Sequence, residues 1–342
     1  MRLELLRPDD WHLHLRDGDG MRSVLADTAR VFARAIVMPN LKPPVTTVAA
    51  AAAYRERILA ARPRGSTFEP LMTLYLTDRT SPDEIRLAKQ SGFVHGVKYY
   101  PAGATTNAEN GVTAWQSARP ALEAMAEFDV PLLVHGEVTA PTVDVFDREL
   151  VFLTEILEPL RRTIPGLRVV LEHVTTAEAV DYVLAGGPRI AATITPQHLL
   201  WNRNELFRGG IRPHAYCLPV LKRERHREAL VRAATGDNPQ FFLGSDSAPH
   251  ARHTKETTCG CAGVYSAPCA LELYAEAFEA VGALDRLEAF ASRRGATFYR
   301  LPLNTERITL ETGEWRVPDC VPFGEATLVP MRAGEVLNWR VV

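Results

Sequence analysis

The chain has 342 residues, of which 46% are hydrophobic and 23% are charged, and its formal net charge at pH 7 is -2. These values are typical of a folded globular protein and exclude a disordered chain, a collagen and a coiled coil. No run of like charges predicts a nucleic-acid site, and no apolar stretch is long enough for a membrane span or a leader peptide. We therefore expect a cytoplasmic protein that binds small molecules and neither nucleic acid nor membrane.

Short apolar runs alternate with helical patterns along the chain, which indicates βα units and a parallel sheet. We expect eight strands, near residues 10–15, 34–38, 68–76, 94–99, 130–134, 168–173, 190–195 and 241–245. Expected helices include residues 48–61, 81–90, 113–128, 151–162, 177–184 and 222–234.

Eight βα units without an evident linker predict one (β/α)8 TIM barrel rather than two open-sheet domains. We expect a single domain over residues 1–342, in which the residues after about 301 form a short extension packed on the barrel. The five cysteines lack the paired C-x2-C spacing of a structural zinc site, and we expect free thiols.

Polar residues that could bind a metal stand at the ends of these apolar runs. His12 and His14 are two residues apart, so their side chains share one face of a strand. In a (β/α)8 barrel the carboxyl ends of all strands meet on one face, where active sites lie. The remaining candidates occur one per βα unit and are Lys98, His135, His173 and Asp246.

Four imidazoles and one carboxylate are suitable ligands for Zn²⁺, and they exceed what one closed tetrahedral site needs. Two metal ions are therefore the natural interpretation. Such a pair usually needs a bridging anion, and the one remaining strand-end candidate is Lys98, whose protonated ammonium cannot bridge cations.

Eight segments spread over residues 7–268 carry a resemblance to a known family. They are RPDDWHLHLRDG, MPNLKPPVTT, VKYYPAGATTNAENGVT, VHGEVT, LEHVTT, TPQHLLWNRN, CLPVLK and GSDSAPHARHTKETTCGCAGVYSAP. In these segments the sequence resembles the amidohydrolase superfamily and, within it, the shorter, bacterial-type dihydroorotases.

The resemblance implies two Zn²⁺ ions per subunit. Lys98, carboxylated on its amine, would bridge them, with His12, His14 and Asp246 on one ion and His135 and His173 on the other. The implied reaction is the reversible cyclisation of N-carbamoyl-L-aspartate to (S)-dihydroorotate in pyrimidine (UMP) synthesis, by a hydroxide held between the zinc ions with Asp246 as general acid and base. We also expect a homodimer.

Arg16 lies on the same strand face as His14, and its guanidinium could bind a substrate carboxylate through two hydrogen bonds. The resemblance implies further substrate contacts from His14, Asn40, His135 and His250, and from the backbones of Leu218 and Ala262. It also implies that Thr105 and Thr106 belong to a mobile loop that covers the substrate.

Two alternatives stay open. A hydantoinase-like hydrolase of another cyclic amide could share the metal ligands, although a neutral ring would not need Arg16, Asn40 and His250. An inactive barrel with a structural role would be expected to lose metal ligands. The other histidines are interpreted as structural or surface groups, and these are His95, His198, His214, His226 and His253.

Overall fold

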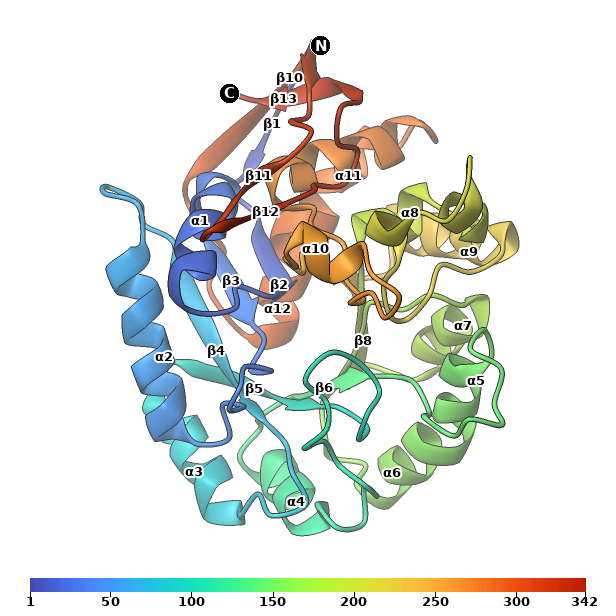
Figure 1. Cartoon of the computed structure of the whole chain (residues 1–342). Helices are drawn as coiled ribbons and strands as arrows, with labels where there is room; N and C mark the ends of the chain where they lie inside the picture. The colour runs from blue at the N-terminus through green and yellow to red at the C-terminus, as the bar shows by residue number, and fades with distance from the viewer.

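The computed structural model describes residues 1–342 and consists of a barrel with helices around it (Figure 1). Eight parallel strands form the wall in the order β2-β3-β4-β5-β6-β7-β8-β9, which confirms the predicted (β/α)8 architecture. The bounds are β2 (Asp9–Leu13), β3 (Arg34–Val37), β4 (Glu69–Tyr75), β5 (Val94–Tyr99), β6 (Leu132–His135), β7 (Val169–Glu172), β8 (Ile190–Ile194) and β9 (Phe241–Leu243).

The helices surround this wall, and none of them combines the length and apolarity that crossing a membrane requires. Short helices α8 (Pro196–Leu200) and α10 (Arg252–Lys255) follow β8 and β9. The other helices are α1 (Gly18–Val31), α2 (Val48–Ala61), α3 (Pro82–Ser91), α4 (Arg119–Glu127), α5 (Arg148–Phe152), α6 (Glu158–Thr163), α7 (Ala177–Ala185), α9 (Glu224–Thr235), α11 (Ala270–Glu279) and α12 (Arg294–Tyr299).

Two predicted helices differ from the structure. The helix expected from residue 113 begins only at Arg119, because Thr113 is bound to Asp78 through its backbone N–H (3.1 Å) and its hydroxyl (2.7 Å). The helix expected over 151–162 is α5 and α6 joined by a π-helical turn, Leu153–Leu157.

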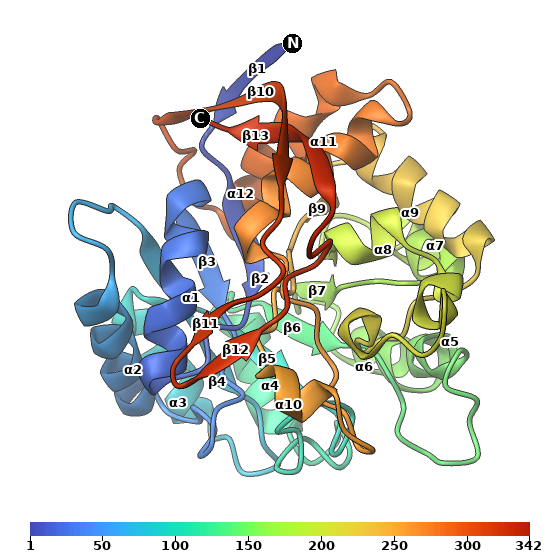
Figure 2. The same ribbon diagram turned by 45° about the horizontal axis from the view of Figure 1, so that its top comes forward.

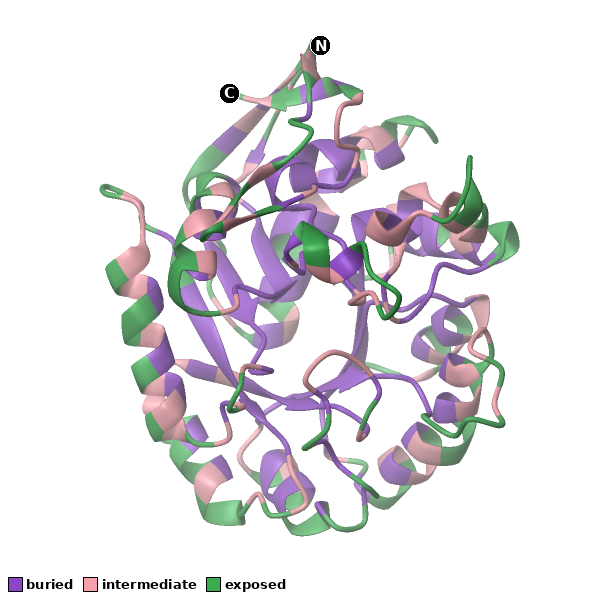
Figure 3. Cartoon of the chain, viewed as in Figure 1, coloured by how far each residue is buried: buried purple, intermediate pink, exposed green.

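Helix α12 closes the end of the barrel at which the strands begin. Its Tyr299 stacks on Trp11 of β2 with ring centroids 4.5 Å apart, inside a buried apolar cluster contributed by the strands. A Cβ atom on Gly295 would lie 2.0 Å from the Trp11 ring, so this close packing requires glycine. The strands of the wall are buried (Figure 3) except at Glu69 and His95. The carboxyl-terminal ends of the strands lie at the opposite end of the barrel.

The barrel closes where β9 meets β2. The Asp246 N–H donates to the His12 carbonyl (2.9 Å) and the His14 N–H donates to the Ser247 carbonyl (3.1 Å). The buried carboxylate of Asp10 accepts from the Ser245 N–H (2.8 Å) and the His12 N–H (3.1 Å). The chain segments that carry His12, His14 and Asp246 are thereby fixed side by side.

The residues after 301 form a sheet together with the start of the chain (Figure 2). The strand β1 (Arg2–Leu6), absent from our predictions, pairs antiparallel with β10 (Arg307–Arg316), which pairs with β13 (Val336–Val341). A small hairpin of β11 (Val321–Phe323) and β12 (Ala326–Leu328) completes this region. Trp339 of β13 is fully buried, and its indole N–H donates to Glu279 of α11 (2.9 Å).

Trp339→Ala should lower the free energy of unfolding by about 3–5 kcal/mol, because a buried aromatic side chain and its hydrogen bond would be lost. Urea denaturation followed by circular dichroism measures this loss. Arg340→Ala, at the exposed neighbouring position, is the matched control and should change stability by less than about 0.5 kcal/mol. Equal stability of the two variants would show that the carboxyl-terminal sheet does not support the barrel.

Candidate metal centre and substrate pocket

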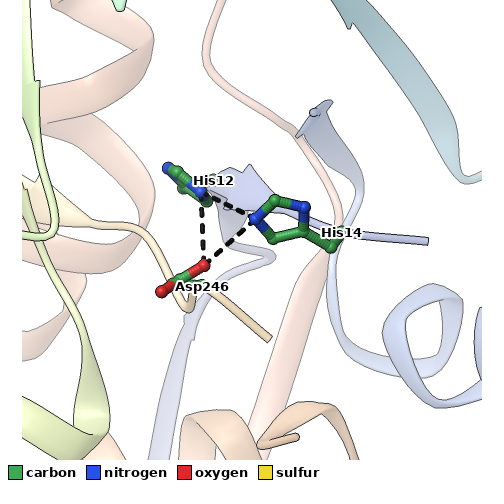
Figure 4. A group of neighbouring side chains, drawn as sticks. All are labelled: His12, His14 and Asp246. Atoms are coloured by element: carbon green, nitrogen blue, oxygen red, sulfur yellow. Dashed lines mark hydrogen bonds and ion pairs between the residues drawn. The ribbon is translucent and has the colours of Figure 1, made fainter. Parts of the chain in front are cut away.

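Three side chains at the closure, His12 on β2 and His14 and Asp246 just after β2 and β9, bring one donor atom each to a common point (Figure 4). His12 Nε2, His14 Nε2 and Asp246 Oδ1 lie 3.3 Å from one another along all three edges of a triangle. A tetrahedral Zn²⁺ ion with bonds of about 2.0–2.1 Å holds its donor atoms about 3.3 Å apart. The triangle therefore fits one face of a metal coordination sphere in both size and donor chemistry.

Local backbone and side-chain contacts fix the orientation of these donors. Asp246 has a left-handed φ of 44°, which is held by its N–H bond to the His12 carbonyl. His14 Nδ1 lies 2.9 Å from Asn40 Oδ1. Because an amide oxygen can only accept, Nδ1 carries the proton and the lone pair of Nε2 is directed toward the triangle.

The electrostatics of the triangle favour a cation. Burial opposes a charge on His12, but Glu172 and Asp246 outweigh it and raise the pKa of His12 to about 9. Burial lowers the pKa of His14 to about 4. Burial also opposes the charge of Asp246, yet His12 and His14 hold the pKa of this carboxyl well below its usual range. A metal ion must displace the proton of His12, so metal binding should strengthen as pH rises.

A second donor group lies beside the first and shares His12 with it. It consists of His12, Glu172 and His173, with His12 Nδ1 3.1 Å from Glu172 Oε1. The ring centroids of His173 and His135 are 4.9 Å apart. His135 Nε2 is hydrogen-bonded to Glu137 Oε2 (2.8 Å). The other ring nitrogen, Nδ1, is therefore the atom of His135 that could bind a metal ion.

Lys98 lies completely buried between these groups. Its ammonium contacts the Glu172 carboxylate and lies 4.7 Å from the centre of the Tyr100 ring. Burial lowers the pKa of Lys98, while Glu172 opposes this change. The amine thus contacts the second donor group through Glu172.

The donor groups open into a pocket that contains eleven of the thirteen predicted site residues. Of the other two, Lys98 is buried beside Glu172, and His250 lies next to Arg16. The pocket is lined by His12, His14, Arg16, Asn40, Tyr100, Thr105, Thr106, His135, His173, Leu218, Asp246, Ala248, Ala262 and Gly263.

Arg16 provides a positive charge at one side of this pocket. Its Nε donates to the Pro249 carbonyl (3.0 Å), and its Nη2 donates to His250 Nε2 (2.8 Å). Burial lowers the pKa of His250 to about 2, so this imidazole is neutral and can accept. The remaining N–H groups of Arg16 are available to an anionic ligand.

The loop with the two predicted threonines lies against the pocket through Asn40. The Asn40 side-chain N–H donates to the Thr106 carbonyl (3.0 Å), and the Asn107 side-chain N–H donates to the Asn40 carbonyl (2.8 Å). Asn40, predicted as a substrate contact, therefore also orients His14 and anchors the loop.

Sequence reasoning missed Ala248 and Gly263, which line the pocket, and three residues with polar side chains at the site. Glu172 and Glu137 stand next to predicted ligands in LEHV and VHGE, and strand alternation could have directed Glu172 into the barrel. Tyr100 has a buried hydroxyl without a hydrogen-bond partner. His198, which we interpreted as structural, has ring nitrogens in contact with the Thr195 hydroxyl (2.7 Å) and the Pro219 carbonyl (3.1 Å).

Comparisons with known proteins agree with this geometry. The profile of the Amidohydrolase family matches residues 10–310. A dihydroorotase of Picosynechococcus sp. is 65% identical over 339 residues, which are 99% of this chain and 98% of that protein. The crystal structure of dihydroorotase from Campylobacter jejuni has a TM-score of 0.91 and 36% identity, with 99% and 97% of the two chains covered. Dihydroorotase of Saccharomyces cerevisiae, in complex with 5-fluoroorotic acid, has a TM-score of 0.91 and 33% identity, with 100% and 98% covered.

The barrel, its strand-end donors and the match over most of the chain define the class: the chain belongs to the amidohydrolase family. Within this family it groups with the dihydroorotases, which are 65% identical to it over nearly the full length. The protein is accordingly an enzyme of the hydrolase class.

His14→Ala should weaken Zn²⁺ binding by more than about 100-fold, because it removes one metal ligand of the triangle. Loss of a residue that only supports a metal ligand already lowers metal affinity by about 10–100-fold. Competition with a chromophoric chelator measures the affinity. His214→Ala is the control, since His214 pairs with Glu256 away from the pocket. Unchanged affinity of the His14 variant would exclude the triangle as a metal site.

Proposed function

We propose that the protein is a dihydroorotase that interconverts (S)-dihydroorotate and N-carbamoyl-L-aspartate in de novo pyrimidine synthesis. The structural observation that carries this proposal is the position of Arg16 beside the donor triangle: Arg16 Nη1 is 3.4 Å from His14 Nδ1. A ring amide near the metal ligands would thus have its carboxylate near the guanidinium. The identity to dihydroorotases supports the same substrate.

The carboxylate of the substrate would be bound by Arg16, with His250 and Asn40 beside it. His250 accepts from Arg16 and so holds the guanidinium in place. The backbones of Leu218 and Ala262, which line the pocket, would contact the ring. A guanidinium suits this role because its planar donors match a carboxylate.

The cofactor in this proposal is a pair of Zn²⁺ ions, which would be held by His12, His14 and Asp246 and by His135 and His173, with carboxylated Lys98 as a further ligand. When bound, these ions activate water and polarise the amide carbonyl. Asp246 takes the proton of the attacking water in hydrolysis and delivers it to the ring nitrogen as the C–N bond breaks. Since Oδ1 belongs to the triangle, Oδ2 is the oxygen that carries this proton.

Lys98 can react with CO2 only as a neutral amine, and burial favours that form. The product is an anionic carbamate, which supplies the oxygen ligands that an ammonium lacks. The proposal also includes a cytoplasmic location, a homodimer, and closure of the Thr105–Thr106 loop over the substrate.

The protein with zinc should hydrolyse dihydroorotate in preference to hydantoin, because the pocket offers a cation to the substrate carboxylate. Arg16→Met should lower kcat/KM for dihydroorotate by about 10–100-fold, the value of one charged hydrogen-bonded contact, and leave hydantoin turnover nearly unchanged.

Steady-state assays with both substrates decide between these activities. Arg57→Met is the control, because Arg57 pairs with Asp17 and belongs to neither of the two groups of metal-binding side chains. Preference for hydantoin would favour the hydantoinase-like alternative. Absence of turnover together with absence of metal would favour the inactive barrel.

Lys98→Ala should lose bound zinc and most of its activity, since the bridging carbamate would be absent, and small carboxylic acids should restore part of the rate. Metal counting, turnover with and without acetate, and the intact mass of the native protein test this. Lys89→Ala, at an exposed position, is the control. Two metal ions and a near-normal rate in the Lys98 variant would refute the bridging role.

A further inference from the structure

A buried lysine outside the metal cluster connects two segments that form the substrate pocket. Lys255, at the end of α10, is only 4% exposed. Its ammonium donates to three backbone carbonyls, of Tyr216 (3.1 Å), Cys261 (2.9 Å) and Gly263 (2.6 Å). Each of the three protons of the ammonium therefore has one acceptor.

The three carbonyls belong to residues that are within two residues of, or themselves, lining residues of the pocket. Tyr216 precedes Leu218 by two residues, and Cys261 and Gly263 are the two neighbours of Ala262. The segments are also joined directly, because the Gly263 N–H donates to the Tyr216 carbonyl (2.9 Å). Lys255 thus holds both segments.

The position of residues 261–263 beside the pocket is narrowly fixed. Gly263 has a φ of 147°, and a Cβ atom there would lie 2.8 Å from His250 Cδ2 and 2.9 Å from Ala248 Cβ. His250 in turn accepts from Arg16. A shift of residues 261–263 would therefore disturb both the ring contacts and the support of Arg16.

We infer that Lys255 is a positioning residue for substrate binding, which acts by holding the backbone of residues 216–218 and 261–263. This inference rests on the proposed function. Without the ammonium, the Cys261 and Gly263 carbonyls lose their donor and Tyr216 keeps only the bond from the Gly263 N–H, so the segments move to find other donors. The metal ligands lie on strand ends that Lys255 does not contact, so metal binding stays intact.

The test is Lys255→Met, which removes the donors and keeps a side chain of similar length. We expect KM for dihydroorotate to rise by about tenfold or more, which corresponds to about 1.4 kcal/mol or more. We expect kcat within about threefold of wild type and an unchanged zinc content, because Lys255 does not contact the donor cluster.

The matched control is Arg294→Met. Arg294 is also buried and also donates to three backbone carbonyls, those of Ala234, Gly236 and Phe241, at the closed end of the barrel. This variant should lose stability without a change in KM. If both variants raise KM equally, the effect is general destabilisation and the inference is wrong.

Lys255→Arg provides a second variant if the methionine variant does not fold. It keeps the charge, but its planar guanidinium cannot place donors as the tetrahedral ammonium does. We expect a rise in KM of a few fold at constant kcat and zinc content. A KM equal to that of wild type in the folded variants would overturn the inference.

Hydrogen–deuterium exchange separates this inference from the proposed function, since it needs no substrate. Peptides covering residues 214–220 and 256–264 should exchange faster in the Lys255 variants than in wild type, while the peptide with His12 and His14 should not. Unchanged exchange overturns the inference even if the enzyme hydrolyses dihydroorotate. Faster exchange in a protein without that activity rejects the proposed function alone.

Discussion

The contact on which the site depends is the closure of the barrel between β2 and β9. Two backbone hydrogen bonds across it, from Asp246 to His12 and from His14 to Ser247, bring together residues more than 230 positions apart in sequence. The donor triangle is a direct result of this contact, because each of its members lies in a segment that the closure fixes. Asp10 reinforces the closure from inside by accepting from both sides.

The sequence predicted the strands and the residues at their ends well, because burial on both faces gives each strand a continuous apolar run whose end is marked by a polar side chain. It could not predict β1, whose partner β10 lies about 300 residues away and leaves no local signal. It also missed Glu172, since an acid before a histidine does not reveal that its carboxylate reaches both His12 and Lys98. Such contacts depend on side-chain packing inside the barrel.

The donor cluster contains buried charges of both signs, and their mutual contacts explain how the barrel tolerates them. Glu172 contacts His12 and Lys98, while Asp246 contacts His12 and His14. Removal of one partner would leave an uncompensated buried charge, which is costly. The same contacts hold the imidazole and carboxylate donor atoms at separations that suit a metal ion. Because buried ion pairs add little to folding stability, their main effect is to place the metal-binding atoms.

The two sides of the pocket use different parts of the chain. The donor side consists of side chains at strand ends, whereas the lining also includes Leu218, Ala262 and Gly263 from two loop segments, whose backbones we propose as ring contacts. Substitution of a residue does not remove its backbone N–H or carbonyl group. The position of such a group is set by the neighbouring residues that hydrogen-bond to the segment and pack against it. In this chain Lys255 holds the carbonyls, and Gly263 permits the close approach to His250. On the proposed function, recognition of the ring would therefore depend on residues that do not touch it, and these residues could change without loss of a metal ligand.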